Sequence, residues 1–598
     1  MEPKKQTIFQ GLVLNIYEAV YLLIEKDNEE DGLEALSEML EVEPKFFRKT
    51  FKELVELLTR IFRIKNIEGG VRRMTTEILV DFAEKSPTLF RKKPEALKST
   101  IEMVFYHMIE ISSEITEEWM RPKEGYNDDM EDDEDFETTR FGMGAIDRLI
   151  YTIGEEEMLP ILSQTIELML ANADWRYKYT AVMALSQIGE YIEDVDKISS
   201  VLHMIVSFLK HENPMMRYAA CHAIGQISDD MQPKFQEKFG DAIFPELLVI
   251  LQNDAVPRVV SHSAAALTNF LEGMKFEQIA SRLDLLVNLL LGLSINGISL
   301  VKESALSAIS STVEIAKDHY EPYLNKTLEV LFSYYTNQQY AGREYKQLKG
   351  QAIETLTIIA SSVGADLFRP AANQLIQLMI NLQSSQFEQT DPQKSYILAG
   401  WQRLCLVYGR ELGTHLEHIL PGLFQLVENV VREEIELIGD ELKEEEDDQN
   451  INTHDTEEAE VAISMLNVFI EQLGPLYNPY VAQTVNLLCK IIKEHPNEDV
   501  KEEACKCLPN LIIAVKTENS ALAVDLAKVF MGTLVETMEK EYDSQIVIVE
   551  LETLKSILEE LGIQFLNEQE IKDFSEKMLK LLKNADEKKV ISKEGLNQ

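Results

Sequence analysis

Residues 217–229 read Arg-Tyr-Ala-Ala-Cys-His-Ala-Ile-Gly-Gln-Ile-Ser-Asp, a run of small residues followed by large aliphatic ones. The same pattern occurs in three further stretches, 175–190, 262–272 and 301–314. Four alanines occupy equivalent positions and are 39, 43 and 42 residues apart: Ala184, Ala223, Ala266 and Ala308. A period of this length is typical of HEAT and armadillo arrays, in which each repeat is a helical hairpin.

A second amphipathic segment precedes each of these stretches, for example 198–209 and 244–251. The turn between the two segments contains a proline, Pro214 or Pro257, and proline is well tolerated in the first turn of a helix. Each repeat is therefore predicted to be a helix A followed by a helix B. Weaker copies occur at 32–40, 72–82, 349–360, 395–408 and 499–515, and period-two alternation is sparse. We predict an all-α protein, a HEAT-repeat α-solenoid built as a superhelical array of antiparallel helix pairs.

Two acidic stretches interrupt the array, 114–137 and 433–448. Charge blocks of this kind bury little apolar surface, so we expect loops there. The predicted organisation is HEAT repeats in 1–113, an acidic loop insertion in 114–140, central HEAT repeats in 141–432, a second acidic loop in 433–458 and C-terminal repeats in 459–598. The first loop contains a run of four carboxylates, Asp132, Asp133, Glu134 and Asp135.

The net charge limits the possible partners. With 102 acidic and 58 basic residues, the chain carries a formal charge of −44. This charge repels nucleic acid and anionic lipid headgroups, and it attracts basic proteins and peptides. We expect basic protein partners, with no direct binding to nucleic acid or membranes.

The remaining composition indicates an intracellular protein. The longest apolar run, 285–293, is interrupted by Asn288 and is shorter than the roughly 20 residues that a membrane-spanning helix needs. The amino terminus lacks the apolar core and cleavage site of a secretory signal. Five cysteines are spread over 598 residues, which fits a reducing compartment without disulfides: Cys221, Cys405, Cys489, Cys505 and Cys507.

Sequence motifs for catalysis are absent. The chain has no Gly-x-x-x-x-Gly-Lys-Ser/Thr loop, no His-Glu-x-x-His and no Gly-x-Ser-x-Gly. Two pairs have spacings that resemble half of a zinc site, Cys505 with Cys507 and His415 with His418, but neither has the second pair that tetrahedral zinc requires. We predict no enzyme activity, no cofactor and no metal.

Polar residues recur in register on the predicted B helices. Six positions after each reference alanine stand four acidic residues, Glu190, Asp229, Glu272 and Glu314. Three positions after it stand four polar residues, Gln187, Gln226, Asn269 and Ser311. Spacings of three place both sets on one stripe of each helix. Because B helices line the inner surface of a HEAT array, we predict a carboxylate ladder on that surface.

The spacing of this ladder suits an extended lysine-rich peptide. Packed helices lie about 8–10 Å apart, and an extended chain advances about 3.3 Å per residue. One carboxylate would therefore meet the peptide about every three residues. Solubility alone could also place an acidic residue near the end of a helix, so a single position decides little and the repeated register carries the prediction.

The stretch 174–190, followed by 217–226, resembles the importin-beta family of nuclear transport receptors, and most of all the branch that carries histones and ribosomal proteins. The likeness extends through 262–272, 349–354, 362–364 and 395–405. It implies a receptor that binds nuclear-localisation signals on its concave face, docks phenylalanine-glycine nucleoporins outside, and releases cargo to Ran-GTP. In related receptors, residues matching Asp147, Glu190 and Asn269 contact a lysine of the cargo. The expected location is the cytoplasm and the nucleus, with shuttling through the nuclear pore as a monomer.

The chain departs from the family pattern at its start. Relatives are longer and begin with repeats that make the first Ran contact, whereas Met1 enters the array part-way. We expect a fragment or a shortened form, which leaves release by Ran-GTP open. The alternative function is a HEAT scaffold subunit of a constitutive protein complex.

Two features allow more than one interpretation. Trp175 at the start of a B helix could stack on a cargo side chain or pack between repeats, and for Trp401 a core position is favoured. The acidic loop after Trp119 could contact Ran, shield the cargo groove or act as a solvated spacer.

Overall fold

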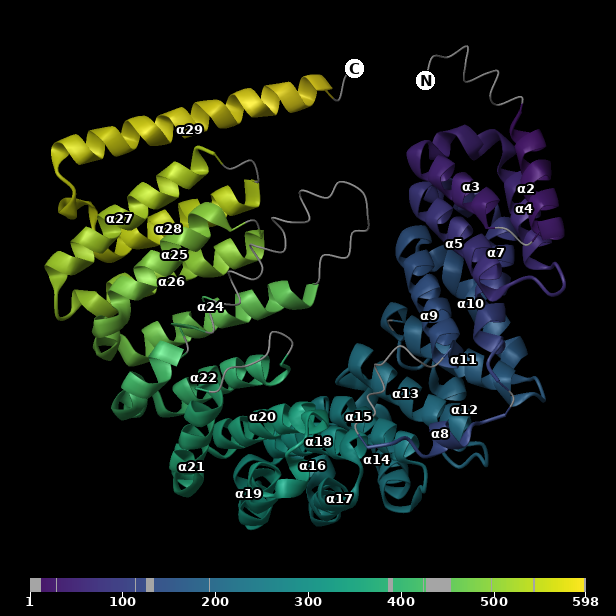
Figure 1. Cartoon of the computed structure of the whole chain (residues 1–598), viewed down its shortest axis with the longest axis horizontal. Coiled ribbons are helices and arrows are strands. Elements are labelled where there is room, and N and C mark those ends of the chain that lie inside the picture. Colours follow the sequence, from purple (N-terminus) through teal and green to yellow (C-terminus); the bar gives the residue numbers. More distant parts are fainter. Residues whose placement is uncertain are drawn as a thin grey trace. The chain divides into compact units, whose positions relative to one another are not determined.

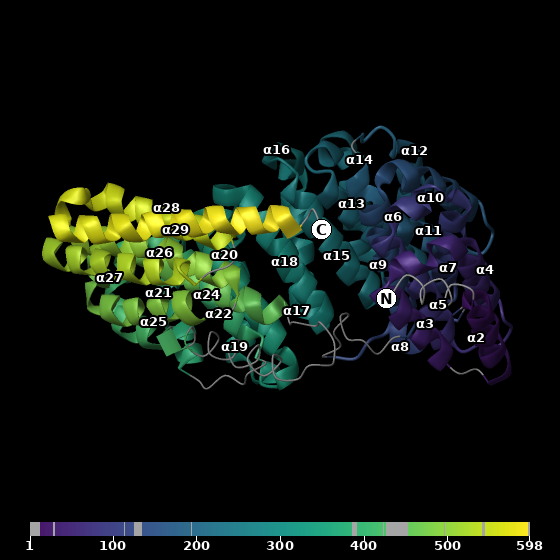
Figure 2. The same ribbon diagram turned by 90° about the horizontal axis from the view of Figure 1, so that it is seen from above.

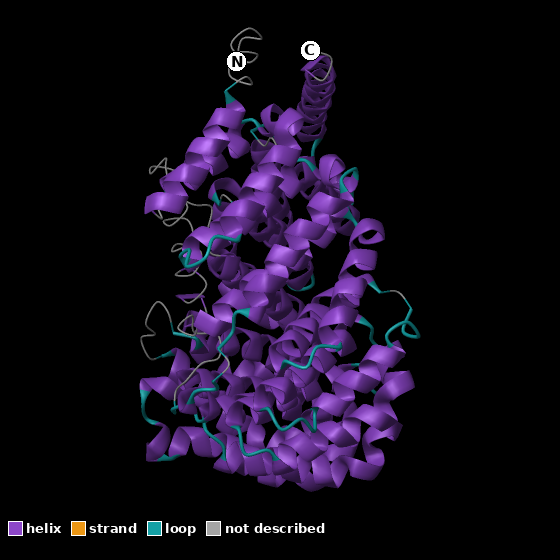
Figure 3. Ribbon diagram, turned by 90° about the vertical axis from the view of Figure 1, so that its right-hand side faces the viewer, coloured by secondary structure: helices purple, strands orange, loops and turns teal. Residues whose placement is uncertain are grey.

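The computed structural model describes residues 12–595 except 28–29, 113, 125–133, 193, 385–390, 423, 426–427, 429–452, 496 and 541–543. Within those residues the chain folds into helices joined by turns, with no strand (Figure 3). It forms two compact units, Met1–Ala316 and Lys317–Gln598. The predicted all-α HEAT-repeat solenoid is confirmed.

Unit Met1–Ala316 is a stack of helix pairs in two layers (Figure 1). The A layer contains α2 (Val13–Asp27), α4 (Phe51–Phe62), α7 (Pro94–Ile109), α10 (Glu155–Leu170), α12 (Ser199–Phe208), α14 (Lys234–Asn253) and α17 (Leu283–Asn296). The B layer contains α3 (Asp31–Val42), α5 (Gly69–Lys85), α9 (Glu134–Ile153), α11 (Trp175–Ile188), α13 (Pro214–Asp230), α15 (Pro257–Glu272) and α18 (Ser299–Ala316). Each B helix packs against the next, so equivalent positions on consecutive B helices become neighbours.

Short helices occupy several connections in this unit. They are η1 (Pro44–Thr50), α6 (Pro87–Arg91), α8 (Glu117–Met120), η2 (Gly189–Tyr191), α16 (Phe276–Ile279) and η3 (Ala280–Arg282). The predicted turn prolines are confirmed as the first residues of α13 and α15. Asn213 caps α13, because its side-chain oxygen accepts from the amide nitrogen of Met215 at 2.8 Å.

Small residues let neighbouring B helices approach closely. A Cβ added at Gly225 of α13 would lie 3.0 Å from the Cα of Ala266 on α15, so a larger residue would push the two helices apart. The alanines that define the repeat are themselves buried: Ala184, Ala223 and Ala308 are 0% exposed, and Ala266 is 4% exposed. The pattern of small residues therefore fixes the distance between consecutive B helices.

One segment is long and apolar enough to cross a membrane by length and composition alone, Phe276–Asn296. In the structure it is divided among α16, η3 and α17, and its longest continuous α-helix, α17, has 14 residues. Several aliphatic side chains of α17, including Leu286 and Leu290, are buried against the neighbouring helices. This packing is that of a core helix in a repeat.

Unit Lys317–Gln598 repeats the two-layer arrangement. Its A layer contains α19 (Glu321–Thr336), α21 (Ala365–Gln383), the helical residues 416–422, α25 (Val481–Glu494) and α27 (Ser520–Met538). Its B layer contains α20 (Lys346–Val363), α22 (Gln393–Tyr408), α24 (Thr453–Leu473), α26 (Glu498–Lys516) and α28 (Ser544–Leu561), and α29 (Glu568–Gly595) follows. Consecutive B helices again lie side by side (Figures 1 and 2).

The predicted acidic loops contain more helix than expected. Region 114–140 includes α8 and the start of α9, which begins at Glu134. Asp132 and Asp133 lie outside the described residues, while Glu134 and Asp135 open α9. In region 433–458, α24 begins at Thr453 and the preceding residues lie outside the described part.

Candidate functional site

The acidic residues predicted as a ladder lie near the carboxyl ends of consecutive B helices. Asp229 is in the last turn of α13, Glu272 ends α15 and Glu314 is in the last turn of α18. Glu190 is in the short 3-10 turn η2 that continues α11, rather than in an α-helix. Glu190, Glu272 and Glu314 are exposed, and Asp229 is half-buried. The carboxylates therefore stand at one end of adjacent helices and are open to a ligand.

These carboxylates are close enough to repel one another. Partial burial raises the pKa of Glu272, and the neighbouring Asp229 and Glu314 raise it further. Burial likewise raises the pKa of Asp230, with further contributions from Glu190 and Asp229. One chain of like charges thus runs from η2 to α18. A cation bound between two of them would relieve this repulsion.

Tyr191 joins Asp147 to this chain of charges. Its hydroxyl donates to Oδ1 of Asp147 on α9 at 2.9 Å. The pKa of Tyr191 is raised mainly by burial, and hydrogen bonds to Glu190 and Asp147 raise it further. Tyr191, the residue after Glu190, therefore ties the turn η2 to Asp147 of the preceding repeat. It was not among the predicted site residues, because it lies beyond the helix on which the register was read.

The predicted amides lie beside the carboxylates. Nε2 of Gln226 donates to Oδ1 of Asp230 at 2.9 Å, so this amide orients a carboxylate that the sequence register passed over. Nδ2 of Asn269 donates to the carbonyl oxygen of Gly225 at 3.5 Å, a long contact that leaves the amide able to take another partner. The structure thus adds Asp230 to the candidate site.

Charge compensation is weak along the ladder. In the part of the chain that the structure describes, Asp147, Glu190, Asp229 and Glu272 form no ion pair with lysine or arginine. The carboxylates of the preceding B helix, by contrast, are paired with a cation. Arg148 of α9 forms ion pairs with three carboxylates of α5, Glu77, Asp81 and Glu84. The uncompensated stretch accordingly begins at Asp147.

Trp175 is the first residue of α11, beside its capping residue Asp174, as the sequence predicted. Its ring is half-buried and meets Tyr179 edge-on, with 6.3 Å between ring centroids. It lies at the amino end of the helix, whereas the ladder lies at the carboxyl ends. Trp175 and the carboxylates are therefore at opposite ends of the B layer.

The segment around Trp119 lies across the amino ends of three B helices. Trp119 is 5% exposed; it packs edge-on against Tyr218 of α13, and the guanidinium of Arg258 on α15 lies 5.5 Å from its ring centroid. Glu124 accepts from both the amide nitrogen (3.0 Å) and Oγ (2.6 Å) of Ser299 at the start of α18. Trp119 and Glu124, both within the first acidic region, are therefore anchored on the same layer of helices that carries the ladder.

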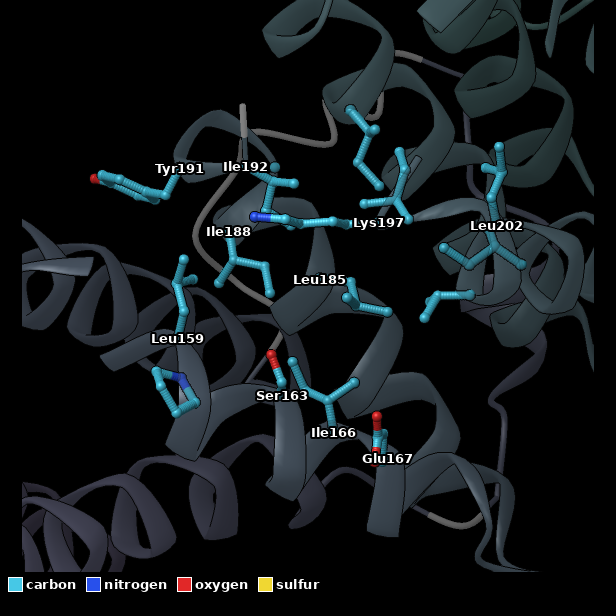
Figure 4. A pocket seen from close by; sticks show the side chains of 16 residues that line it. Leu159, Ser163, Ile166, Glu167, Leu185, Ile188, Tyr191, Ile192, Lys197 and Leu202 are labelled. Carbon is cyan, nitrogen blue, oxygen red and sulfur yellow. The ribbon is translucent and has the colours of Figure 1, made fainter. Parts of the chain in front are cut away.

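An apolar cavity of about 390 Å³ lies between the A and B layers, among α10, α11, η2 and α12. Figure 4 shows Leu159 and Ile166 of α10, Leu185 and Ile188 of α11, and Leu202 of α12 around this space. Lys197 and Glu167 supply charged groups to the lining. Gly189 and Tyr191, on either side of Glu190, also line this cavity, so it adjoins the ladder at η2.

The cysteine and histidine pairs show no metal-site geometry. Cys505 and Cys507 are buried, and all five cysteines are free thiols. Within the described ranges, no group of three or more His, Cys, Asp or Glu side chains is arranged to hold a metal ion.

Comparison with known proteins shows that this chain is similar to importins. The model described as Importin repeat matches residues 64–160, and the model described as HEAT repeats matches residues 162–268. Importin subunit beta-3 of Saccharomyces cerevisiae is 29% identical over 424 residues, which cover 69% of this chain and 38% of that protein. Over most of its length the chain is similar to importins. The probable importin subunit beta-4 of Schizosaccharomyces pombe is 23% identical over 487 residues, covering 77% of this chain and 43% of that protein.

Solved structures show the same fold over almost the whole chain. Kap121p bound to Pho4p superposes with a TM-score of 0.82 at 23% identity, covering 96% of this chain and 56% of the other. Kap121p alone gives a TM-score of 0.84, covering 98% and 58%. The chain spans less than half the length of the two curated relatives named above. Similarity to the branch that carries ribosomal proteins and histones stays a prediction.

Proposed function

We propose that this chain acts in nuclear import and binds lysine-rich localisation signals along the carboxylate ladder. The observation that carries the proposal is the row of carboxylates on five consecutive B helices and their turns, Asp147, Glu190, Asp229, Glu272 and Glu314, in which Glu272 meets the like charges of Asp229 and Glu314. An extended lysine-rich peptide would place one ammonium group near each of them. Each exposed lysine–carboxylate contact contributes only about 0.2–1 kcal/mol, so affinity requires several at once.

Related proteins support a peptide ligand on this fold. Kap121p has been solved bound to Pho4p, to Ste12p and to Nup53p. A further solved form of Kap121p has three acidic residues, each about one HEAT repeat from the next, replaced by lysine. The ladder of the present chain has the same spacing. Asn269 would hold the peptide backbone while the carboxylates take the side chains.

Charge reversal on the ladder tests the proposal. In Glu190→Arg an attraction becomes a repulsion, so the affinity for a fluorescent lysine-rich peptide should fall about tenfold at low salt, measured by fluorescence anisotropy. Asn269→Ala should lower the affinity less. Glu212→Arg is the matched control, because Glu212 is exposed in the turn before α13 and the change in charge is the same.

Each outcome of this assay has a meaning. A loss in Glu190→Arg with none in Glu212→Arg supports the ladder, and the difference should shrink in high salt. Protonation of Glu272 and Asp230 removes charge from the ladder, so the affinity should also weaken as pH falls through their raised pKa values. Equal binding by all variants would remove the ladder and favour the scaffold alternative.

Tyr191→Phe tests how the carboxylates are positioned. The substitution removes the hydroxyl that binds Asp147 but keeps the ring. A hydrogen bond to a charged group contributes about 1.5–3 kcal/mol, and losing this one frees Asp147 to move, so peptide affinity should fall about two- to tenfold. In the Asp147→Asn variant, adding Tyr191→Phe should lower the peptide affinity less than it does in the unaltered protein. The reason is that Asp147→Asn already weakens the hydrogen bond between the two residues. Additive losses would show that Tyr191 acts independently of Asp147.

Ran-GTP and nucleoporins complete the proposed function. We propose that Ran-GTP releases the peptide, which is tested by adding it to the preformed complex; a peptide that stays bound contradicts release. The apolar cavity lined by Leu159, Leu185 and Leu202 is the proposed contact for phenylalanine-glycine nucleoporins, because a phenylalanine ring could fill it. Together these contacts would let a non-enzymatic receptor shuttle between cytoplasm and nucleus.

A further inference from the structure

A basic region stands out in this acidic protein. Residues 44–98 contain 14 Lys or Arg and 7 Asp or Glu, whereas the whole chain has a charge of −44. Electrostatic effects in solution fade over about 8 Å at physiological salt, so an anion near this region meets the local cations rather than the distant ladder. The region is therefore able to attract an anion.

A cavity of about 500 Å³ opens within this region, between α4, α7 and the turn that leads into α5. Arg63, Lys65 and Arg72 line it, and a single carboxylate, Glu102, is also in the lining. Arg63 and Lys65 are exposed and form no ion pair within the described residues. They come from a turn in which Asn66 has a φ of +62°, and this left-handed residue redirects the chain directly after Lys65.

Two polar atoms in the lining lack hydrogen-bond partners. They are the hydroxyl of Thr59 and Nε of Arg72, both buried. The Arg72 side chain is 12% exposed, and its Nη1 donates to both oxygens of Glu110, at 2.7 and 2.9 Å, which leaves Nε unused. Buried donors without acceptors are rare and unfavourable, so an acceptor is expected there.

We propose that this cavity binds a phosphate monoester. A phosphate monoester carries a charge of about −1.5 to −2 and three acceptor oxygens. It could accept from Arg63, Lys65, the Nε of Arg72 and the Thr59 hydroxyl, whereas a carboxylate has only two oxygens for these donors. Phe62 and Tyr106 would flank the group that bears the phosphate. The phosphate could belong to a phosphorylated side chain of a partner protein or to a free phosphate ester.

The experiment compares two forms of one neutral peptide, with serine or phosphoserine at its centre, by titration calorimetry with the full chain. The phosphorylated form should bind about tenfold or more tightly, and Arg63→Ala/Lys65→Ala should remove about tenfold of that affinity. Thr59→Val, which keeps the shape of the side chain, should weaken binding about two- to tenfold. Free O-phosphoserine is the second probe: binding as tight as the peptide's assigns the site to free phosphate esters, and much weaker binding assigns it to a partner's phosphorylated side chain.

A charge-matched control separates a site from general attraction. Lys92→Ala/Lys93→Ala removes two exposed lysines of the same basic region that do not line the cavity, and it should leave the affinity within about twofold. Equal losses in both double variants would overturn the proposal, as would equal binding of the serine and phosphoserine peptides. Neither result would bear on the ladder, because cargo binding is measured with a lysine-rich peptide.

Discussion

Trp401→Ala is expected to destabilise unit Lys317–Gln598 by about 3–5 kcal/mol, the usual cost of emptying a buried aromatic site. Trp401 on α22 is 0% exposed. Its Nε1 donates to Oε1 of Gln383 at 2.8 Å, and Nε2 of Gln383 donates to the carbonyl oxygens of His418 (3.1 Å) and Ile419 (3.0 Å). One side chain thus supports the B layer and, through Gln383, two consecutive A helices.

Hydrogen exchange followed by mass spectrometry is the suitable measurement. A two-unit protein does not have one unfolding free energy, whereas exchange reports each segment separately. Peptides from α20 to α24 should lose protection, and peptides from Met1–Ala316 should not. Trp401→Phe keeps most of the ring but removes the donor to Gln383, so it should cost about 1–3 kcal/mol. Loss of protection confined to α22 would show that Trp401 does not couple its neighbours.

The fold was predictable because the same pattern of small and aliphatic residues recurs along the sequence. Small residues at 184, 223, 266 and 308 set the distance between B helices, so any position in register with them is repeated along the layer. This reasoning predicted Asp229, Glu272 and Glu314 on one stripe of the B helices, and they lie at the carboxyl ends of α13, α15 and α18. It also identified Trp401 as a core residue and Trp175 as the start of a helix.

The same reasoning fails where helices end. Glu190 lies in a 3-10 turn, and Tyr191 follows it, so neither side-chain direction follows the 3.6-residue period. Asp230 was passed over because a register read at one position per helix ignores the adjacent residue, although its carboxylate adjoins Glu190. The residues that complete the candidate site therefore depend on turn geometry, which periodicity does not describe.

Long-range contacts made by segments outside the repeats could not be predicted from the sequence either. The region after Ile109 was predicted to be an acidic loop, yet Trp119 is buried against helices about one hundred residues later in the chain. Glu124 likewise binds Ser299, which is 175 residues away in sequence. No repeat predicts such a pairing, because it occurs only once. The sequence signal that could have indicated an anchored segment is the tryptophan itself, since a tryptophan in a polar stretch is costly to leave exposed.

Arg217→Ala should disturb the ladder by loosening two adjacent repeats. Arg217 is in the first turn of α13, and its Nε and Nη2 donate to the carboxylate of Asp254, at 2.6 and 3.1 Å, in the turn before α15. Its Nη1 donates to the carbonyl oxygens of His211 (2.8 Å) and Glu212 (3.1 Å) in the turn before α13. The side chains of Arg217 and Asp254 are 17% and 4% exposed. Removing the guanidinium leaves a buried carboxylate without its cation, which costs about 3–5 kcal/mol.

Two measurements distinguish a local loss of stability from a loss of stability that also weakens peptide binding by the ladder. Exchange protection should fall in α13 and α15, and because Asp229 and Glu272 end these helices, affinity for the lysine-rich peptide should also fall. The double variant Arg217→Met/Asp254→Asn removes both charges, so it should be less destabilised than the sum of the single variants. Full additivity would mean that the two residues act independently. Unchanged peptide affinity despite lost protection would mean that the spacing of the carboxylates is set elsewhere, by the close contact of Gly225 with Ala266.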